Sequence, residues 1–137
     1  MSLNDAIAAE LPGLRREAES LMVDAVLVER TDGTTIDPDT LAEVLAWVPV
    51  HTGKARIQRP GSLAPRDVVA GGYEFDERAL IVQLPLTAAG IASGHRVTVT
   101  AVGPLSDPDL IGLVATVQAN LTKTHPTKRT LVCEEVE

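Results

Sequence analysis

Residues 107–137, DPDLIGLVATVQANLTKTHPTKRTLVCEEVE, form the stretch that decides the fold of this chain. Apolar and polar residues alternate in two of its segments, and a period of two residues is typical of strands with one buried face. A short polar segment that contains His125 and Pro126 separates the two, and the second segment includes Cys133. The stretch therefore predicts two amphipathic β-strands, and nothing in it indicates an active site.

Earlier segments with strand character lie at residues 25–30, 54–59, 73–86 and 96–102. They combine aliphatic or β-branched residues with polar ones, and turn signals rich in glycine, proline and aspartate separate them. About six or seven short strands with such punctuation predict a mainly β fold, a small antiparallel β-barrel or sandwich. The absence of βαβ alternation disfavours a parallel nucleotide-binding sheet.

Two turn signals and one ambiguous segment follow the first of these strands. The sequence TDGT at residues 31–34 predicts that a first hairpin starts there, and DPDT at residues 37–40 predicts a second turn or a helix cap. Residues 39–50 fit either an amphipathic helix or an alternating strand. Composition slightly favours the helix, with Asp37 or Asp39 as its N-cap.

The N-terminal segment is predicted to be helical in two pieces. Apolar residues recur every four positions from Leu3 to Leu11, and Pro12 can open a second piece. This helical segment either lies on the body of its own subunit or acts as an arm that docks on a neighbour. We therefore divide the chain into an N-terminal helical arm, residues 1–23, and a β-barrel domain, residues 24–137.

A long projecting loop is expected within the barrel domain at residues 60–72, PGSLAPRDVVAGG. Its two prolines and three glycines oppose regular structure. A loop of this length usually has a function or is disordered.

The composition argues against a membrane protein, a nucleic-acid-binding protein and an enzyme. Every apolar run is shorter than the roughly 18 residues of a membrane-spanning helix, and a formal net charge of −7 opposes broad phosphate binding. His51, His95 and His125 lack the spacing of a metal site, and no local motif joins them to Cys133. We expect Cys133 to be a buried small hydrophobic residue, and we expect no catalytic residue, metal or cofactor.

Two groups of basic residues are candidates for contacts with partners. The first group comprises Arg56, Arg59 and Arg66 around the loop, and the second comprises Lys123, Lys128 and Arg129 around His125. Each group is either an ordinary solvated face or an interface with a partner of opposite charge.

Residues 107–137, the TGKARI segment at residues 52–57 and the amphipathic N-terminus together resemble the small head-to-tail connector proteins of actinobacterial siphophages, of the head-closure or stopper type. The resemblance implies a β-barrel protein that forms a homo-oligomeric ring in the phage neck, closes the DNA-filled head and joins it to the tail. It also favours a strand at residues 39–50, where related connectors place a hairpin.

The resemblance implies partners and a location as well. The ring would have six-fold or twelve-fold symmetry, with portal and adaptor proteins above it and the tail terminator or tail tube below it. It would be assembled in the host cytoplasm, would reside in the virion neck without contacting a membrane, and would surround packaged DNA without tight, specific binding. The alternatives are a tail terminator or tail-completion protein and, in a different class, a cytosolic small-barrel binding module.

Two sets of residues take roles under this resemblance. The loop residues that would face the channel or the adjoining ring are Pro60, Ser62, Arg66, Asp67 and Val68. The residues that would contact ring neighbours or partners are Arg56, Arg59, Lys123, His125, Lys128 and Arg129.

Overall fold

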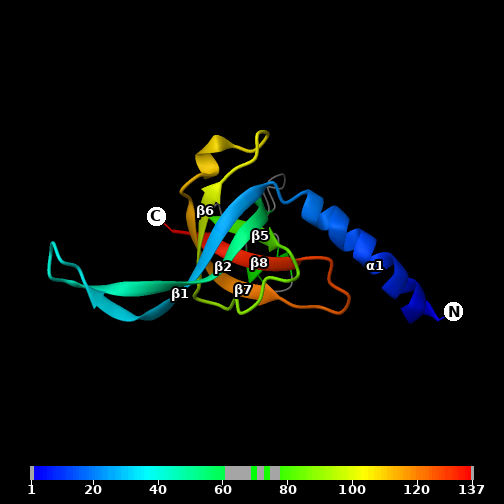
Figure 1. The fold of residues 1–137 in the computed structure, drawn as a ribbon, viewed down its shortest axis with the longest axis horizontal. Coiled ribbons are helices and arrows are strands. Elements are labelled where there is room, and N and C mark those ends of the chain that lie inside the picture. The colour runs from blue at the N-terminus through cyan, green and yellow to red at the C-terminus, as the bar shows by residue number, and fades with distance from the viewer. Residues whose placement is uncertain (1, 61–68, 71–72, 75–77, 137) are drawn as a thin grey trace.

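Six antiparallel strands close into a barrel in the computed structural model, which describes residues 2–60, 69–70, 73–74 and 78–136 (Figure 1). The elements in chain order are α1 (Leu3–Ser20), β1 (Asp24–Ile36), β2 (Glu43–Gln58), β3 (Val69–Ala70), β4 (Tyr73–Glu74), β5 (Ala79–Leu84), β6 (Arg96–Ala101), the 3-10 helix η1 (Pro108–Leu110), β7 (Val114–Leu121) and β8 (Arg129–Glu135). The order around the barrel is β1-β2-β5-β8-β7-β6, and β3 pairs separately with β4. The predicted small antiparallel barrel with an N-terminal helix is confirmed.

Aliphatic side chains fill the barrel interior. Successive strand residues point to opposite faces, so one residue in two enters the core, as with Val97 and Val99 in β6 or Leu131 and Cys133 in β8. Small and branched side chains suit the narrow interior of a barrel of few strands. The expectation that Cys133 is a buried small hydrophobic residue is therefore confirmed, at 1% exposure.

The β1–β2 hairpin extends far beyond the barrel (Figure 1). β1 pairs with β6 only through residues 25–29, and β2 pairs with β5 only through residues 56–58. The pairing of β1 with β2 nevertheless continues outward to Ile36 and Glu43. We call residues 30–48 the hairpin arm.

The structure corrects two expectations about the hairpin arm. Residues 31–34 are not a turn, because the strand continues through a bulge in which Gly33 has φ +76°; the turn lies at residues 38–40. The helix that composition favours at residues 39–50 is also wrong, since β2 begins at Glu43. Pairing with β1 satisfies the backbone of this segment, and such tertiary pairing overrides a weak local preference.

Helix α1 is one continuous helix, so the expected break at Pro12 is wrong. A proline removes one backbone hydrogen bond from a helix but does not have to end it. A capping box closes the N-terminus: the Ser2 hydroxyl accepts from the Asp5 N–H at 3.2 Å, and the Asp5 carboxylate accepts from the Ser2 N–H at 3.1 Å. Among the described residues, no helix combines the length and the apolar character that crossing a membrane requires.

Candidate assembly surface

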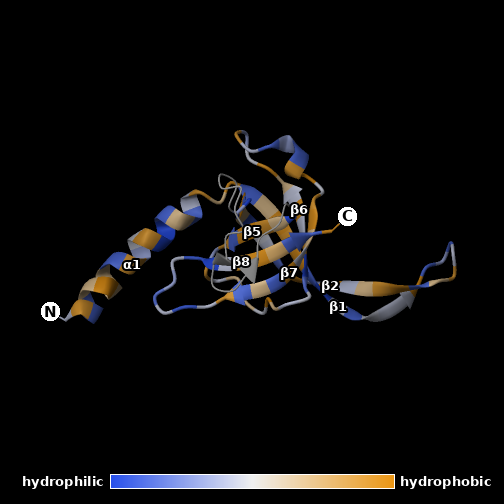
Figure 2. Ribbon diagram, turned by 180° about the vertical axis from the view of Figure 1, so that it is seen from behind, coloured by the Kyte–Doolittle hydropathy of each residue, from blue (hydrophilic) through white to orange (hydrophobic). Residues whose placement is uncertain are grey.

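The hairpin arm exposes large apolar side chains. Ile36, Leu45 and Val44 are 63%, 56% and 41% exposed, and Leu41, at the end of the turn, is 78% exposed. Figure 2 shows this hydrophobic stretch along the projecting part of β2. Exposed apolar residues that gather on one element mark a contact surface more often than scattered ones do.

The turn of the arm holds Leu41 in a strained conformation. Leu41 has φ +59°, in the left-handed region that side chains other than glycine and asparagine rarely adopt. Its N–H donates to the Asp37 carbonyl at 2.8 Å, and the Asp37 N–H donates to the Ala42 carbonyl at 2.9 Å. The two bonds close the turn and hold the leucine outward.

Acidic side chains surround this apolar tip. Asp37, Asp39 and Glu43 lie within seven residues of one another in the sequence, and Asp32 pairs with Arg30 at 3.9 Å. The Asp37 carboxylate also accepts from the Asp39 N–H at 2.9 Å, which stabilises the turn. The tip of the arm therefore presents hydrophobic side chains within a negative rim.

A three-residue contact attaches the arm to the barrel. The guanidinium carbon of Arg96, on β6, lies 4.1 Å from the centroid of the Trp47 ring, on β2. The same guanidinium donates to the Glu29 carboxylate, on β1, at 2.8 Å. A partly buried cation that contacts both strands of the hairpin fixes the direction in which the arm leaves the barrel.

A second surface lies on the other side of the molecule, where α1 approaches residues 122–128 between β7 and β8. Arg15 donates from Nε to the Pro126 carbonyl at 3.1 Å, and Glu19 pairs with Lys54 at 3.4 Å. No residue of α1 is buried, so these polar contacts are the main attachment of the helix among the described residues. We call α1 together with residues 122–128 the helix–loop surface.

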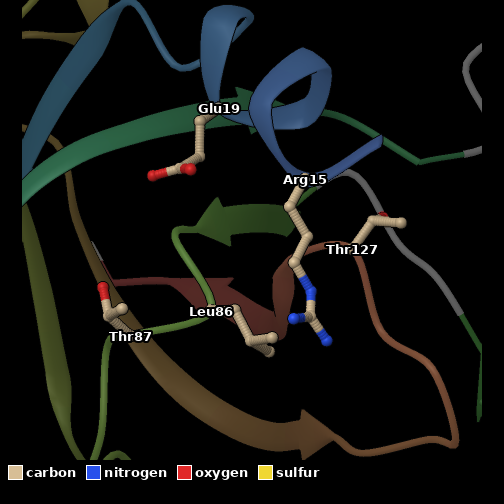
Figure 3. A pocket seen from close by; sticks show the side chains of 5 residues that line it. All are labelled: Arg15, Glu19, Leu86, Thr87 and Thr127. Atoms are coloured by element: carbon tan, nitrogen blue, oxygen red, sulfur yellow. The ribbon is translucent and has the colours of Figure 1, made fainter. Parts of the chain in front are cut away.

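A groove of about 340 Å³ separates α1 from the barrel. Figure 3 shows Arg15 extending from α1 toward Leu86, and Glu19 of the same helix, Thr87 and Thr127 are the other residues that line the groove. The groove is thus lined by the apolar Leu86 and, on the side of α1, by the cation of Arg15 and the carboxylate of Glu19.

The structure separates the basic residues singled out from the sequence. Lys123, His125 and Lys128 lie in the β7–β8 loop, and Arg129 opens β8, where it donates to the Leu86 carbonyl at 3.3 Å. Lys123, His125 and Lys128 belong to the helix–loop surface, and Arg129 borders it.

Arg56 and Arg59 lie elsewhere. Arg56 is on the barrel wall, opposite Gln83, and Arg59 pairs with Glu135 at 2.8 Å near the other rim. Pro60 directly follows Arg59. The remaining predicted loop positions, Ser62, Arg66, Asp67 and Val68, lie outside the described residues.

Sequence reasoning missed both the arm tip and the Arg15–Arg16 pair as site residues. The alternation of Val44, Ala46 and Val48 was the available signal for the arm, but the same residues also fit a helical period. Arg15 and Arg16 stand beside Glu17 and Glu19 in the sequence, a pattern typical of a solvated helix face.

Burial shifts the pKa of two titratable groups of the barrel, Cys133 and His51. Burial raises the pKa of the Cys133 thiol to about 12, so the thiol stays protonated at neutral pH. Burial lowers the pKa of His51, whose Nε2 is buried without a hydrogen-bond partner among the described residues. Within the described part of the chain, no three His, Cys, Asp or Glu residues gather in a way that could hold a metal ion.

Comparisons with known proteins bear on the family and on the fold. The model of a family of unknown function (DUF6093) matches residues 14–134. The solution structure of protein SF1141 from Shigella flexneri 2a is similar, with a TM-score of 0.58 and 18% identity over 83% of this chain and 92% of that one. At this identity the likeness concerns the fold alone. Comparison with curated proteins gives no match.

Proposed function

The chain belongs to the DUF6093 family, whose function is unknown, and from its geometry we propose that it is a structural subunit of a phage neck ring. In this proposal the ring closes the DNA-filled head and joins it to the tail. Its work is binding and assembly, and it requires no bond to be made or broken.

One observation carries the proposal: a barrel with a filled interior holds two projecting surfaces outward. Aliphatic side chains occupy the space inside the strands, so the barrel acts as a rigid support. The large exposed apolar side chains of the arm, Ile36, Leu41 and Leu45, lie away from this core. Burying them against another subunit would remove apolar surface from water.

The sequence resemblance to head-to-tail connectors supports the choice of a neck ring over other assemblies. The net charge is compatible with a neck ring, because a formal charge of −7 per subunit gives a ring through which DNA can pass without adhering. Many copies of one modest contact would hold such a ring together.

The proposal is tested in a phage that encodes this chain. Deleting the gene should yield DNA-filled heads and separate tails, and supplying the wild-type chain in trans should restore joined particles. Electron microscopy of the neck should then locate the protein between head and tail, and its level would distinguish a stopper from a tail terminator. Normal tailed particles in the deletion strain would refute the proposal. So would a gene neighbourhood without portal, capsid and major tail genes.

A further inference from the structure

The hairpin arm and the helix–loop surface project in opposite directions. They occupy the two ends of the longest axis of the molecule, with the barrel between them, in both the front and the back views (Figures 1 and 2). Surfaces placed in this way cannot meet within one molecule, but they can meet between successive copies.

The tip of the arm is acidic, and the part of the helix–loop surface formed by the second half of α1 and residues 122–128 is basic. Asp37, Asp39 and Glu43 at the tip of the arm make no ion pair with any described residue. The cations of the helix–loop surface are Arg15, Arg16, Lys123 and Lys128. Helix α1 also carries four acidic residues, of which Asp5 and Glu10 lie in its first half and Glu19 pairs with Lys54. The second half of α1 together with residues 122–128 therefore has four cations against one unpaired carboxylate, that of Glu17. Charge complementarity of this kind favours encounter and fixes register.

Both surfaces also have apolar side chains to bury. Leu14 on α1 is 47% exposed, and Leu121, which directly precedes residues 122–128, is 43% exposed. Helix α1 has 18 residues, contains Pro12 and buries none of its residues. Such a helix is marginal by itself in water, so packing by a partner would stabilise it.

The strain at Leu41 is an independent pointer to the arm tip. Leu41 raises the free energy of the isolated chain in two ways: its φ of +59° strains the backbone, and its apolar side chain is 78% exposed to water. A buried contact in an assembly would offset these costs. The groove beside α1, which Leu86 lines together with Arg15 and Glu19, offers a recess with an apolar side chain next to both a cation and an anion.

We propose that the hairpin arm of one copy of this chain docks on the helix–loop surface of a second copy. An arm-to-arm contact would place the acidic tips together, so the contact is head to tail, and repeated head-to-tail contacts give a ring when their rotation closes. The inference rests on the proposed function only for that closure, and it names the surfaces through which the ring would form.

The test uses two charge-reversed full-length chains. The arm variant is Asp39→Lys/Glu43→Lys, and the surface variant is Arg16→Glu/Lys128→Glu. Sedimentation equilibrium at low and high salt measures self-association, and thermal unfolding checks that each variant folds. Asp109→Lys, on η1 and outside both surfaces, is the control for a carboxylate-to-lysine change elsewhere on the molecule.

The wild-type chain should self-associate. Each variant alone should have an association constant about tenfold lower, because like charges then face each other. An equimolar mixture of the two variants should recover wild-type association, since the basic arm of one fits the acidic surface of the other and the unaltered pair also remains. The control should behave as wild type.

A wild-type chain that stays monomeric up to about 1 mM would overturn the contact. So would a mixture no more associated than its components, which would assign the arm to a different protein. Either result would leave the neck function standing if the deletion phage still lacked joined tails, so the two proposals can fail separately.

Discussion

Leu41 shows how one residue can serve assembly at the expense of the isolated fold. Its left-handed backbone costs about 1 to 2 kcal/mol relative to glycine, partly offset by the greater freedom of glycine in the unfolded chain. We expect Leu41→Gly to raise the free energy of unfolding of the monomer by about 0.5 to 1 kcal/mol and to weaken self-association. Chemical denaturation and sedimentation measure the two effects. Leu105→Gly is the control, because Leu105 is 99% exposed but has no positive φ. Loss of stability on Leu41→Gly would show that the turn is not strained.

Cys133 illustrates a residue whose chemistry is suppressed by its position. The thiol should react with an aromatic disulfide reagent only as fast as the barrel opens, and at full speed in denaturant.

The buried thiol of Cys133 also makes stability depend on pH. In the unfolded chain the thiol loses its proton near the ordinary cysteine pKa of 9.0, whereas in the folded chain it keeps the proton up to a pKa of about 12. The stability that depends on the neutral thiol is thus complete below pH 9.0 and is lost as the pH rises toward 12. Cys133→Ala should remove that part of the alkaline loss, measured by denaturation at several pH values. Rapid labelling of the native chain at neutral pH would contradict burial.

At the scale of elements, the barrel strands could be read from the sequence and the hairpin arm could not. Most of β6 and the first half of β7 alternate buried and more exposed positions, and the same alternation appears in the sequence because one face of each strand meets the core. β8 departs from it, because Leu131, Val132 and Cys133 are buried in a row. The outer half of β2 has no core to impose that pattern, so its apolar residues fit a helix equally well. Its partner in β1, reached across a bulge, decides its structure.

The same physical reason limits what the sequence reveals about the candidate site. The charges of Lys123 and Lys128 could be noticed as a cluster because they lie close in the chain, and the fold places them on one loop. Their proximity to Arg15 depends on α1 folding back toward Pro126, a contact across 111 residues. No local pattern carries that information.

At the scale of the whole molecule, charge predicts how the protein treats DNA. The formal charge of −7 is repeated in every subunit of a ring, whereas DNA binding requires clustered cations that displace counterions from phosphate. The two groups of basic residues also have other contacts. Arg59 of the first group pairs with Glu135. The second group lies at the helix–loop surface, which in our proposal binds the arm of a neighbour.

The purified chain should therefore bind duplex DNA weakly at physiological salt, with only a shallow dependence of affinity on salt concentration. A fluorescence titration at several salt concentrations measures both quantities. The Arg16→Glu/Lys128→Glu chain is the matched comparison, because it reverses two cations of the helix–loop surface and should change DNA affinity little while it weakens self-association about tenfold. Tight binding with a steep salt slope would contradict this view of a channel that DNA slides through. The Arg16→Glu/Lys128→Glu chain could instead lose such tight DNA binding and still self-associate. The helix–loop surface would then be a nucleic-acid site, because the same side chains cannot hold both phosphate and the arm of a neighbour.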